Sequence, residues 1–305
     1  MATQEYGFDG RVAIVTGAGR GIGRAYARLL AERGARVVVN DLGGSMAGEG
    51  ADAGPASTVA TEIVAAGGEA IADTHDVASF EGAGTLVATA VDAFGRIDVL
   101  VNNAGIMRWA GMPELRADDV DAHLAVHVMG SFHTARAAWP HMVDQGYGRI
   151  VMTTSSGMLG NPGNLAYATA KGGVVGMMRS LATAGRTHDI RVNCIAPAAY
   201  TRMAGSGADP ADDDPMAVQM APELVAPMVA VLAHESCPVT GEIYTAGAGR
   251  FARIFLASTT GYVHENGAPT VEDVVSHWDA INDESGYYVP VDLMDWSARY
   301  TAHQR

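Results

Sequence analysis

Short apolar runs alternate with longer, alanine-rich stretches of helical spacing along most of the chain. The runs are apolar throughout instead of alternating with polar residues, which is typical of parallel strands covered by helices on both faces. They comprise residues 12–16, 37–40, 97–101, 150–154 and 190–195. The pattern therefore predicts an α/β fold for residues 1–248, a doubly wound parallel sheet with helices on both faces.

Two stretches interrupt this rhythm. Residues 204–215 are small, acidic and bounded by proline, so we expect them to form a surface loop. Residues 249–305 are rich in aromatic as well as acidic side chains, a composition too aromatic for a solvated linker. We expect a C-terminal extension over 249–305 that packs on the same domain or on a neighbouring subunit.

Composition narrows the range of partners. The formal net charge of -14 disfavours binding to nucleic acid or to an anionic membrane surface. The two cysteines, Cys194 and Cys237, are far apart, which argues against a disulfide framework or a thiolate metal site. The N-terminus lacks the basic and apolar regions of a signal peptide, and we see no uninterrupted apolar stretch of membrane-spanning length. We therefore expect a cytoplasmic protein that binds a small molecule, and no metal.

A glycine-rich loop, TGAGRGIG from Thr16, follows the first predicted strand and leads directly into the helical run 24–33. In this position, backbone amides and the positive end of the helix dipole can approach a pyrophosphate, which side chains at the glycines would block. Such strings also occur where a loop needs positive φ, so the strand and helix context decides the interpretation. The candidate cofactor-binding residues in the loop are Gly17, Arg20, Gly21, Ile22 and Gly23.

The second predicted strand is followed by Asp41. A carboxylate there can accept hydrogen bonds from both ribose hydroxyls of adenosine and repels a 2′-phosphate, which favours NAD over NADP. Arg20 acts in the opposite direction, because a nearby cation could accommodate that phosphate. Alternatively, Asp41 only forms the turn that precedes Gly43 and Gly44.

Tyr167 and Lys171 lie four residues apart at the start of an amphipathic run that reaches Gly185, so they share a helix face. A phenol with a pKa of about 10 is a poor base at neutral pH, but an adjacent ammonium stabilises the phenolate. The same spacing also occurs in ordinary surface pairs, so the interpretation depends on the other motifs.

Those motifs occur in one order: the glycine loop, Asn103-Ala104-Gly105 after the fourth strand, Ser155 after the fifth, and the Tyr167/Lys171 pair. In this combination, the chain up to about residue 247 resembles the short-chain dehydrogenase/reductase family. The resemblance implies a Rossmann-like fold and NAD-dependent interconversion of a secondary alcohol and a ketone. It also implies that Tyr167 is the general acid/base, that Lys171 lowers its pKa and binds ribose, and that Ser155 orients the substrate oxygen. The further cofactor contacts that it implies are Asp76, Val77, Asn103, Ala104, Gly105, Pro197 and Thr201.

Residues 39–44, 94–98, 137–139 and 234–237, together with the C-terminal extension, narrow the resemblance. They are similar to the (3R)-hydroxyacyl-CoA dehydrogenase unit of peroxisomal multifunctional enzyme type 2, also described as 17β-hydroxysteroid dehydrogenase type 4. This implies a (3R)-hydroxyacyl-CoA or a 17β-hydroxysteroid as substrate, and family membership implies a homodimer or homotetramer. A CoA phosphate could use positive charge from several arginines, whereas a steroid needs none. The candidate arginines are Arg108, Arg202, Arg250 and Arg253.

Some positions depart from the family pattern. His127 stands where many members carry an asparagine that holds a water for proton relay. An imidazole has a pKa near working pH, so His127 could join such a relay. Alternatively, it only caps a backbone carbonyl. The usual spacing before Tyr167 selects Thr154 as the orienting hydroxyl, but strand register favours Ser155. Pro197 is followed by an alanine in place of the usual glycine, which restricts the backbone beside the nicotinamide.

Other function classes are weaker. The chain could oxidise another neutral secondary alcohol, or could bind NAD as a non-catalytic regulatory protein, although intact Tyr167 and Lys171 argue against the latter. A serine hydrolase using Ser155 and His127 lacks the G-x-S-x-G elbow. His123 and His127 have a spacing suited to zinc, but no third ligand is evident.

Overall fold

The computed structural model describes residues 6–203, 210–211, 213–265 and 267–304. Most of the acidic loop predicted over 204–215, namely 204–209 and 212, therefore lies outside the described residues. The chain divides into two compact units, residues 1–253 and 254–305. The sheet of the first unit takes in a last strand that begins after the boundary at residue 248 predicted from the sequence.

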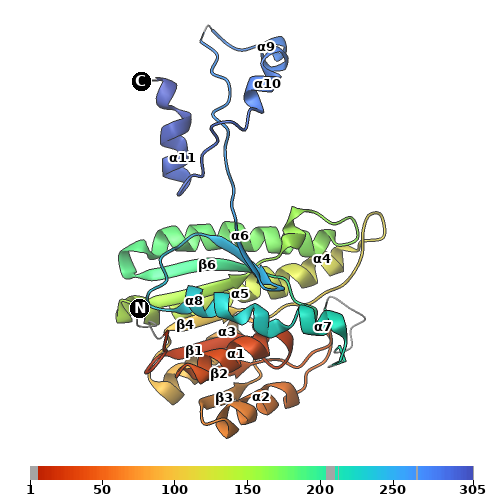
Figure 1. Ribbon diagram of the computed structural model, residues 1–305, viewed down its shortest axis with the longest axis vertical. Helices are drawn as coiled ribbons and strands as arrows, with labels where there is room; N and C mark the ends of the chain where they lie inside the picture. Colours follow the sequence, from red (N-terminus) through yellow and green to blue (C-terminus); the bar gives the residue numbers. More distant parts are fainter. Residues whose placement is uncertain (1–5, 204–209, 212, 266, 305) are drawn as a thin grey trace. The chain divides into compact units, whose positions relative to one another are not determined.

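An eight-stranded sheet forms the first unit, in the order β3-β2-β1-β4-β5-β6-β7-β8 (Figure 1). The pairs from β3 to β7 are all parallel. The strands are β1 (Val12–Thr16), β2 (Arg36–Asn40), β3 (Glu69–Asp73), β4 (Val99–Asn102), β5 (Gly148–Thr153), β6 (Ile190–Pro197), β7 (Ile243–Gly247) and β8 (Arg250–Ile254). This arrangement confirms the predicted doubly wound α/β fold.

Helices cover both faces of this sheet (Figure 1). On one face α1 packs against α2 and α8, and on the other α3 packs against α5, while α4 and the π-helical turn η1 pack against α6. Their bounds are α1 (Gly21–Glu32), α2 (Gly54–Ala65), α3 (Phe80–Phe94), α4 (Ala117–His123), η1 (Leu124–Met129), α5 (Gly130–Gln145), α6 (Leu165–Gly185), α7 (Pro215–Gln219) and α8 (Ala226–Ala233). Short 3₁₀ turns η2 (Ser156–Leu159), η3 (Arg186–His188) and η4 (Pro222–Leu224) complete the unit.

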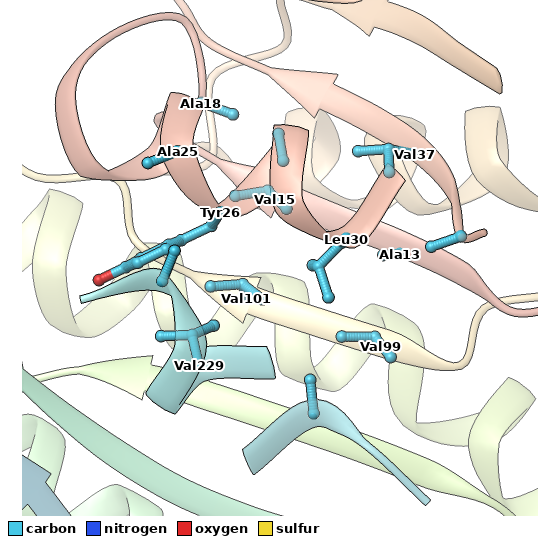
Figure 2. Close-up of a cluster of buried hydrophobic side chains, with 14 of the residues drawn as sticks. Ala13, Val15, Ala18, Ala25, Tyr26, Leu30, Val37, Val99, Val101 and Val229 are labelled. Carbon is cyan, nitrogen blue, oxygen red and sulfur yellow. The ribbon is translucent and has the colours of Figure 1, made fainter. Parts of the chain in front are cut away.

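Helix α1 is fixed to the sheet by its apolar face. Tyr26 and Leu30 are buried against Val15, Val101 and their neighbours in the cluster shown in Figure 2. Burying an apolar side chain of this size contributes about 1.5–3 kcal/mol to stability. This packing holds the N-terminus of α1, and with it the glycine loop, in place above the ends of β1 and β4.

The segment 215–233 reaches the length and mean hydropathy of a membrane-spanning helix, although we expected no such stretch from the sequence. In the structure it consists of three short pieces, α7, η4 and α8, with breaks around Met220 and Val225. Helix α8 buries Val229 and Leu232 in the core of the first unit. Packing of α8 on α1 therefore accounts for part of the apolar composition of the segment 215–233.

The described residues of the second unit form three short helices and a final 3₁₀ turn: α9 (Val271–Ser276), α10 (Trp278–Ile281), α11 (Leu293–Tyr300) and η5 (Ala302–Gln304). Thr270 and Asp273 form a capping box at the start of α9. Aromatic pairs such as Trp296 and Tyr300, with ring centroids 4.5 Å apart, stack within the unit. Across 254–265 and 267–304, however, no residue is buried.

Candidate active site

A cleft of about 500 Å³ opens beyond the carboxyl ends of the central strands. Ligands of doubly wound sheets bind where the strand order reverses, which here is between β1 and β4. With the exception of Gly23, all the predicted site residues line this cleft. They are Gly17, Arg20, Gly21, Ile22, Asp41, Asp76, Val77, Asn103, Ala104, Gly105, His127, Ser155, Tyr167, Lys171, Pro197 and Thr201.

The glycine loop is shaped for close backbone approach. Gly17 and Gly21 have φ of +63° and +53°, in the left-handed region that favours glycine. Helix α1 begins after Arg20 without a side-chain cap or an acidic residue in its first turn, so its free amides and positive dipole end are available to an anion. A side chain at Gly23 would collide with the carbonyl of Gly17. Glycine is therefore required at this position by packing within the loop, and not by contact with the cleft.

Thr16 and Asn103 tie the loops after β1 and β4 together. The Thr16 Oγ1 accepts hydrogen bonds from the backbone amides of Asn103 and Ala104, both at 3.0 Å. The Asn103 side-chain amide donates to the carbonyls of Thr16 and Gly17, also at 3.0 Å. The two loops that flank the switch point are therefore rigidly joined, and Thr16 is a positioning residue that the sequence analysis did not single out.

Asp41 uses both carboxylate oxygens to fix the end of β2. Oδ2 accepts from the backbone amide of Gly19 at 2.8 Å, and Oδ1 accepts from that of Gly43 at 2.7 Å. Asp41 therefore does form the turn before Gly43, as the alternative interpretation held. It also lines the cleft, so it is not only a turn residue. The guanidinium of Arg20 donates weakly to the Gly44 carbonyl, 3.4 Å away, on the same side of the site.

Tyr167, Lys171 and Ser155 meet at the base of the cleft. The Lys171 Nζ donates to the carbonyl of Thr153 at 2.7 Å and lies 5.4 Å from the centre of the Tyr167 ring. The Ser155 Oγ accepts from the amide of Gly157 at 3.0 Å, and the Ser155 side chain is also hydrogen-bonded with Tyr167. The hydroxyl of Thr154 is buried and donates to the Lys171 carbonyl, so Ser155 is the one of the two candidate hydroxyls that lines the cleft.

Burial changes the acidity of this pair in opposite directions. It lowers the pKa of Lys171 to about 7. It raises the pKa of Tyr167, and a hydrogen bond with the Ser155 side chain partly opposes that rise. The resemblance implied that Lys171 lowers the pKa of the phenol; here burial is the largest effect on that pKa, and the Lys171 Nζ is engaged with the Thr153 carbonyl. Lys171 is the only lysine in the sequence.

His127 lies on the π-helical turn η1, and its ring is nearly perpendicular to that of Tyr167, with the ring centroids 5.4 Å apart. Its Nε2 is 2.9 Å from the Ile106 carbonyl, whereas the buried Nδ1 has no hydrogen-bond partner. Burial holds the pKa of His127 well below its ordinary value, which corrects the expectation that it titrates near working pH. A Cβ at Gly105 would lie 2.5 Å from the imidazole, so that glycine gives the ring its space.

Unpartnered polar atoms are concentrated in the cleft. Five buried side-chain atoms in the described part of the chain have no hydrogen-bond partner, and four of them belong to Asn103, His127, Thr153 and Asn164, which line the cleft. Buried polar groups are nearly always paired, so this concentration is typical of a site that receives a polar ligand. Sequence patterns did not point to Thr153 or Asn164, nor to two other lining residues, Asn40 and His75.

The remaining predicted contacts lie around the rim. Val77 is buried beside Gly130, and the methyl group of Thr201 lies 3.5 Å from the position that a Cβ on Gly21 would occupy. Ala198 does not have positive φ, so alanine in place of glycine costs no backbone strain there.

Of the four candidate arginines, Arg202 alone lines the cleft. Arg108 is held by Asp119 and the Ala47 carbonyl.

His123 stacks on His127 with ring centroids 5.8 Å apart. Its Nδ1 is 2.7 Å from the Asp119 carbonyl, and its Nε2 accepts from the Arg108 amide. Both nitrogens are therefore engaged with backbone. Among the residues that the structure describes, no group of three or more His, Cys, Asp or Glu is arranged to hold a metal ion.

Comparisons with known proteins agree with this geometry. The family model for short chain dehydrogenases matches residues 11–209. A putative short-chain type dehydrogenase/reductase of Mycobacterium tuberculosis is 42% identical over 281 residues, which cover 92% of this chain and 96% of that protein. Peroxisomal multifunctional enzyme type 2 of Mus musculus is 44% identical over 94% of this chain, but the match spans only 39% of the mouse protein.

A solved structure provides a further comparison. It is a 7α-hydroxysteroid dehydrogenase in complex with NADH and 7-oxo glycochenodeoxycholic acid. It superposes with a TM-score of 0.70 at 30% identity and covers 80% of this chain and 96% of its own.

Proposed function

The chain belongs to the short-chain dehydrogenase family, whose members are oxidoreductases that act on CH–OH groups, and we propose that it is an NAD-dependent dehydrogenase of a secondary alcohol. One observation supports this most strongly. Tyr167, Ser155 and Lys171 share a single cleft with the uncapped N-terminus of α1. An acid/base group, an oxygen-orienting hydroxyl and a dinucleotide cradle are the parts that alcohol oxidation with a nicotinamide requires.

The residues of the cleft fit a dinucleotide. The first-turn amides of α1, with Gly17 and Gly21, would hold the pyrophosphate, and the Lys171 ammonium would bind a ribose hydroxyl. A bound nicotinamide would supply hydride acceptance and donation.

The chain's own residues handle the proton. In alcohol oxidation, Tyr167 takes the proton of the substrate hydroxyl while Ser155 donates a hydrogen bond to the same oxygen; in ketone reduction, Tyr167 returns the proton. A part for His127 in a proton relay stays a prediction, since burial keeps the imidazole neutral and its Nε2 is already engaged with the Ile106 carbonyl.

We favour NAD over NADP because Asp41 is fixed at the end of β2, where its carboxylate repels a 2′-phosphate. The related 7α-hydroxysteroid dehydrogenase, which was solved with NADH, supports a nicotinamide dinucleotide in this fold.

For the substrate, we favour a (3R)-hydroxyacyl-CoA, because the match to peroxisomal multifunctional enzyme type 2 spans 94% of this chain. The four candidate arginines do not gather at the cleft, so they give no separate support for CoA over a 17β-hydroxysteroid. The homo-oligomeric state and the cytoplasmic location stay predictions.

A substrate panel tests this proposal. The full chain is incubated with NAD or NADP and a (3R)-3-hydroxyacyl-CoA, its (3S) epimer, a 17β-hydroxysteroid or a simple secondary alcohol, and dinucleotide reduction is followed spectroscopically. We expect turnover with NAD, highest for the (3R) thioester. Activity with NADP alone would refute the role of Asp41, and no activity with any alcohol would refute the proposed function.

The raised pKa of Tyr167 predicts opposite pH profiles for the two directions. Because burial keeps the phenol protonated at neutral pH, alcohol oxidation should accelerate from about pH 7 to 10, where more phenolate forms, whereas ketone reduction should be slowed at the alkaline end. Initial rates at saturating cofactor, measured across this range in both directions, check the sign. Parallel profiles for oxidation and reduction would exclude Tyr167 as the titrating group.

A further inference from the structure

Gly19 lies between the two glycines that have positive φ, yet its own backbone lies outside the left-handed region. The need for glycine there does not come from backbone conformation. A Cβ on Gly19 would lie 2.8 Å from the Asp41 Oδ2 and 2.6 Å from the Cβ of Pro55. Neither neighbour can move freely, because Asp41 is held by two backbone amides and Pro55 lies in the first turn of α2.

The amide of Gly19 is also one of the two donors that fix Asp41. The carboxylate bridges the glycine loop and the loop after β2, with contacts of 2.8 Å to Gly19 and 2.7 Å to Gly43. This bridge forms only if the backbone of residue 19 comes within hydrogen-bond distance of the carboxylate. A side chain at that position would meet the carboxylate as well as the Cβ of Pro55, so the loop and Asp41 would have to move apart and the bridge would be lost.

Arg20 is the opposing charge beside the same bridge. Its guanidinium lines the cleft and contacts the Gly44 carbonyl, three residues beyond Asp41. With Asp41 in place, the carboxylate repels a doubly charged phosphate on the adenosine ribose. With Asp41 displaced, Arg20 becomes the nearer charge to that ribose and attracts such a phosphate.

We propose that Gly19 is a specificity-determining residue, which selects the unphosphorylated dinucleotide by letting Asp41 bridge the two loops. The inference rests on the proposed function and extends it to a residue that acts through another. It makes the preference for NAD a property of the Gly19–Asp41 contact, and not of Asp41 alone.

The test compares kcat/KM for NAD and for NADP, with one alcohol substrate, in four proteins: wild type, Gly19→Ala, Asp41→Ala and the double variant. We expect Gly19→Ala to lower the NAD/NADP ratio by about tenfold or more, mainly through KM for NAD, with kcat at saturating NAD nearly unchanged. Because Gly19 acts through Asp41, adding Gly19→Ala to Asp41→Ala should change the ratio no further. The matched control is Gly84→Ala in α3, where a Cβ meets no atom within 4 Å, and it should keep the wild-type ratio.

Thermal unfolding of each variant separates selectivity from folding. If Gly19→Ala folds only when Asp41 is also replaced, the carboxylate is the obstacle and the proposal is supported. An unchanged NAD/NADP ratio in Gly19→Ala, additive effects in the double variant, or failure to fold in both backgrounds would overturn it. If the wild type used neither dinucleotide, the proposed function itself would fail, which is a different result from an unchanged ratio.

Discussion

Replacing Tyr167 with phenylalanine should lower kcat by about 10²–10⁴-fold, because the variant loses the proposed acid/base group for the substrate oxygen. The ring stays, so its packing against His127 and the shape of the cleft should be preserved. The affinity for NAD should therefore remain close to that of the wild type. Steady-state kinetics together with calorimetric titration of NAD measure the two effects separately.

Tyr26→Phe is the matched control. Tyr26 is also a buried tyrosine whose hydroxyl has no hydrogen-bond partner, but it belongs to α1 and packs in the hydrophobic core, not in the cleft (Figure 2). Loss of this hydroxyl should leave kcat unchanged. Near-normal activity of Tyr167→Phe, or equal losses in the two variants, would rule out Tyr167 as the acid/base group.

The second large effect is expected for Lys171→Met, which keeps an unbranched apolar chain but removes the ammonium. The variant loses the bond to the Thr153 carbonyl and the donor proposed for the ribose. We expect kcat/KM to fall by about 10²–10³-fold, with weaker NAD binding as well as a lower kcat. Kinetics and NAD titration again separate the two components.

Arg28→Ala, which removes an exposed positive charge from α1, is the control for net charge and should keep full activity. If Lys171→Met bound NAD as tightly as the wild type, the ribose contact would be refuted. If it also kept its kcat, Lys171 would have no part in the reaction.

The fold followed from the sequence where strands are buried on both faces. The run 12–16 matches β1, and the runs near β2, β5 and β6 differ from the structure by one or two residues at their ends. The edge strand β3 was not predicted, because among its residues Asp73 alone is buried and no apolar run marks it. No helices were assigned to the extension from the sequence, although Trp296 and Tyr300 have helical spacing and stack on each other along α11.

The site was predictable where a residue type is required by chemistry or by close backbone approach, as at Tyr167, Lys171 and Gly17. Of the two candidate hydroxyls, strand register favoured Ser155, which lines the cleft, whereas loop spacing selected Thr154, whose hydroxyl is turned to the Lys171 carbonyl. The sequence could not give the direction of the pKa shift of Tyr167, which depends on burial. Contacts such as that of Thr16 with the loop after β4 join residues too far apart in sequence to form a pattern.

Because Lys171 is the only lysine in the 305-residue sequence, it can be observed alone in this chain. With selectively labelled lysine, the side-chain NMR signal should titrate with a pKa of about 7, far below the ordinary value, and should shift when NAD is added. That result would place a buried ammonium at the cofactor cleft beside Tyr167. A lysine that titrates at its ordinary value of about 10.4 and does not respond to NAD would contradict the account.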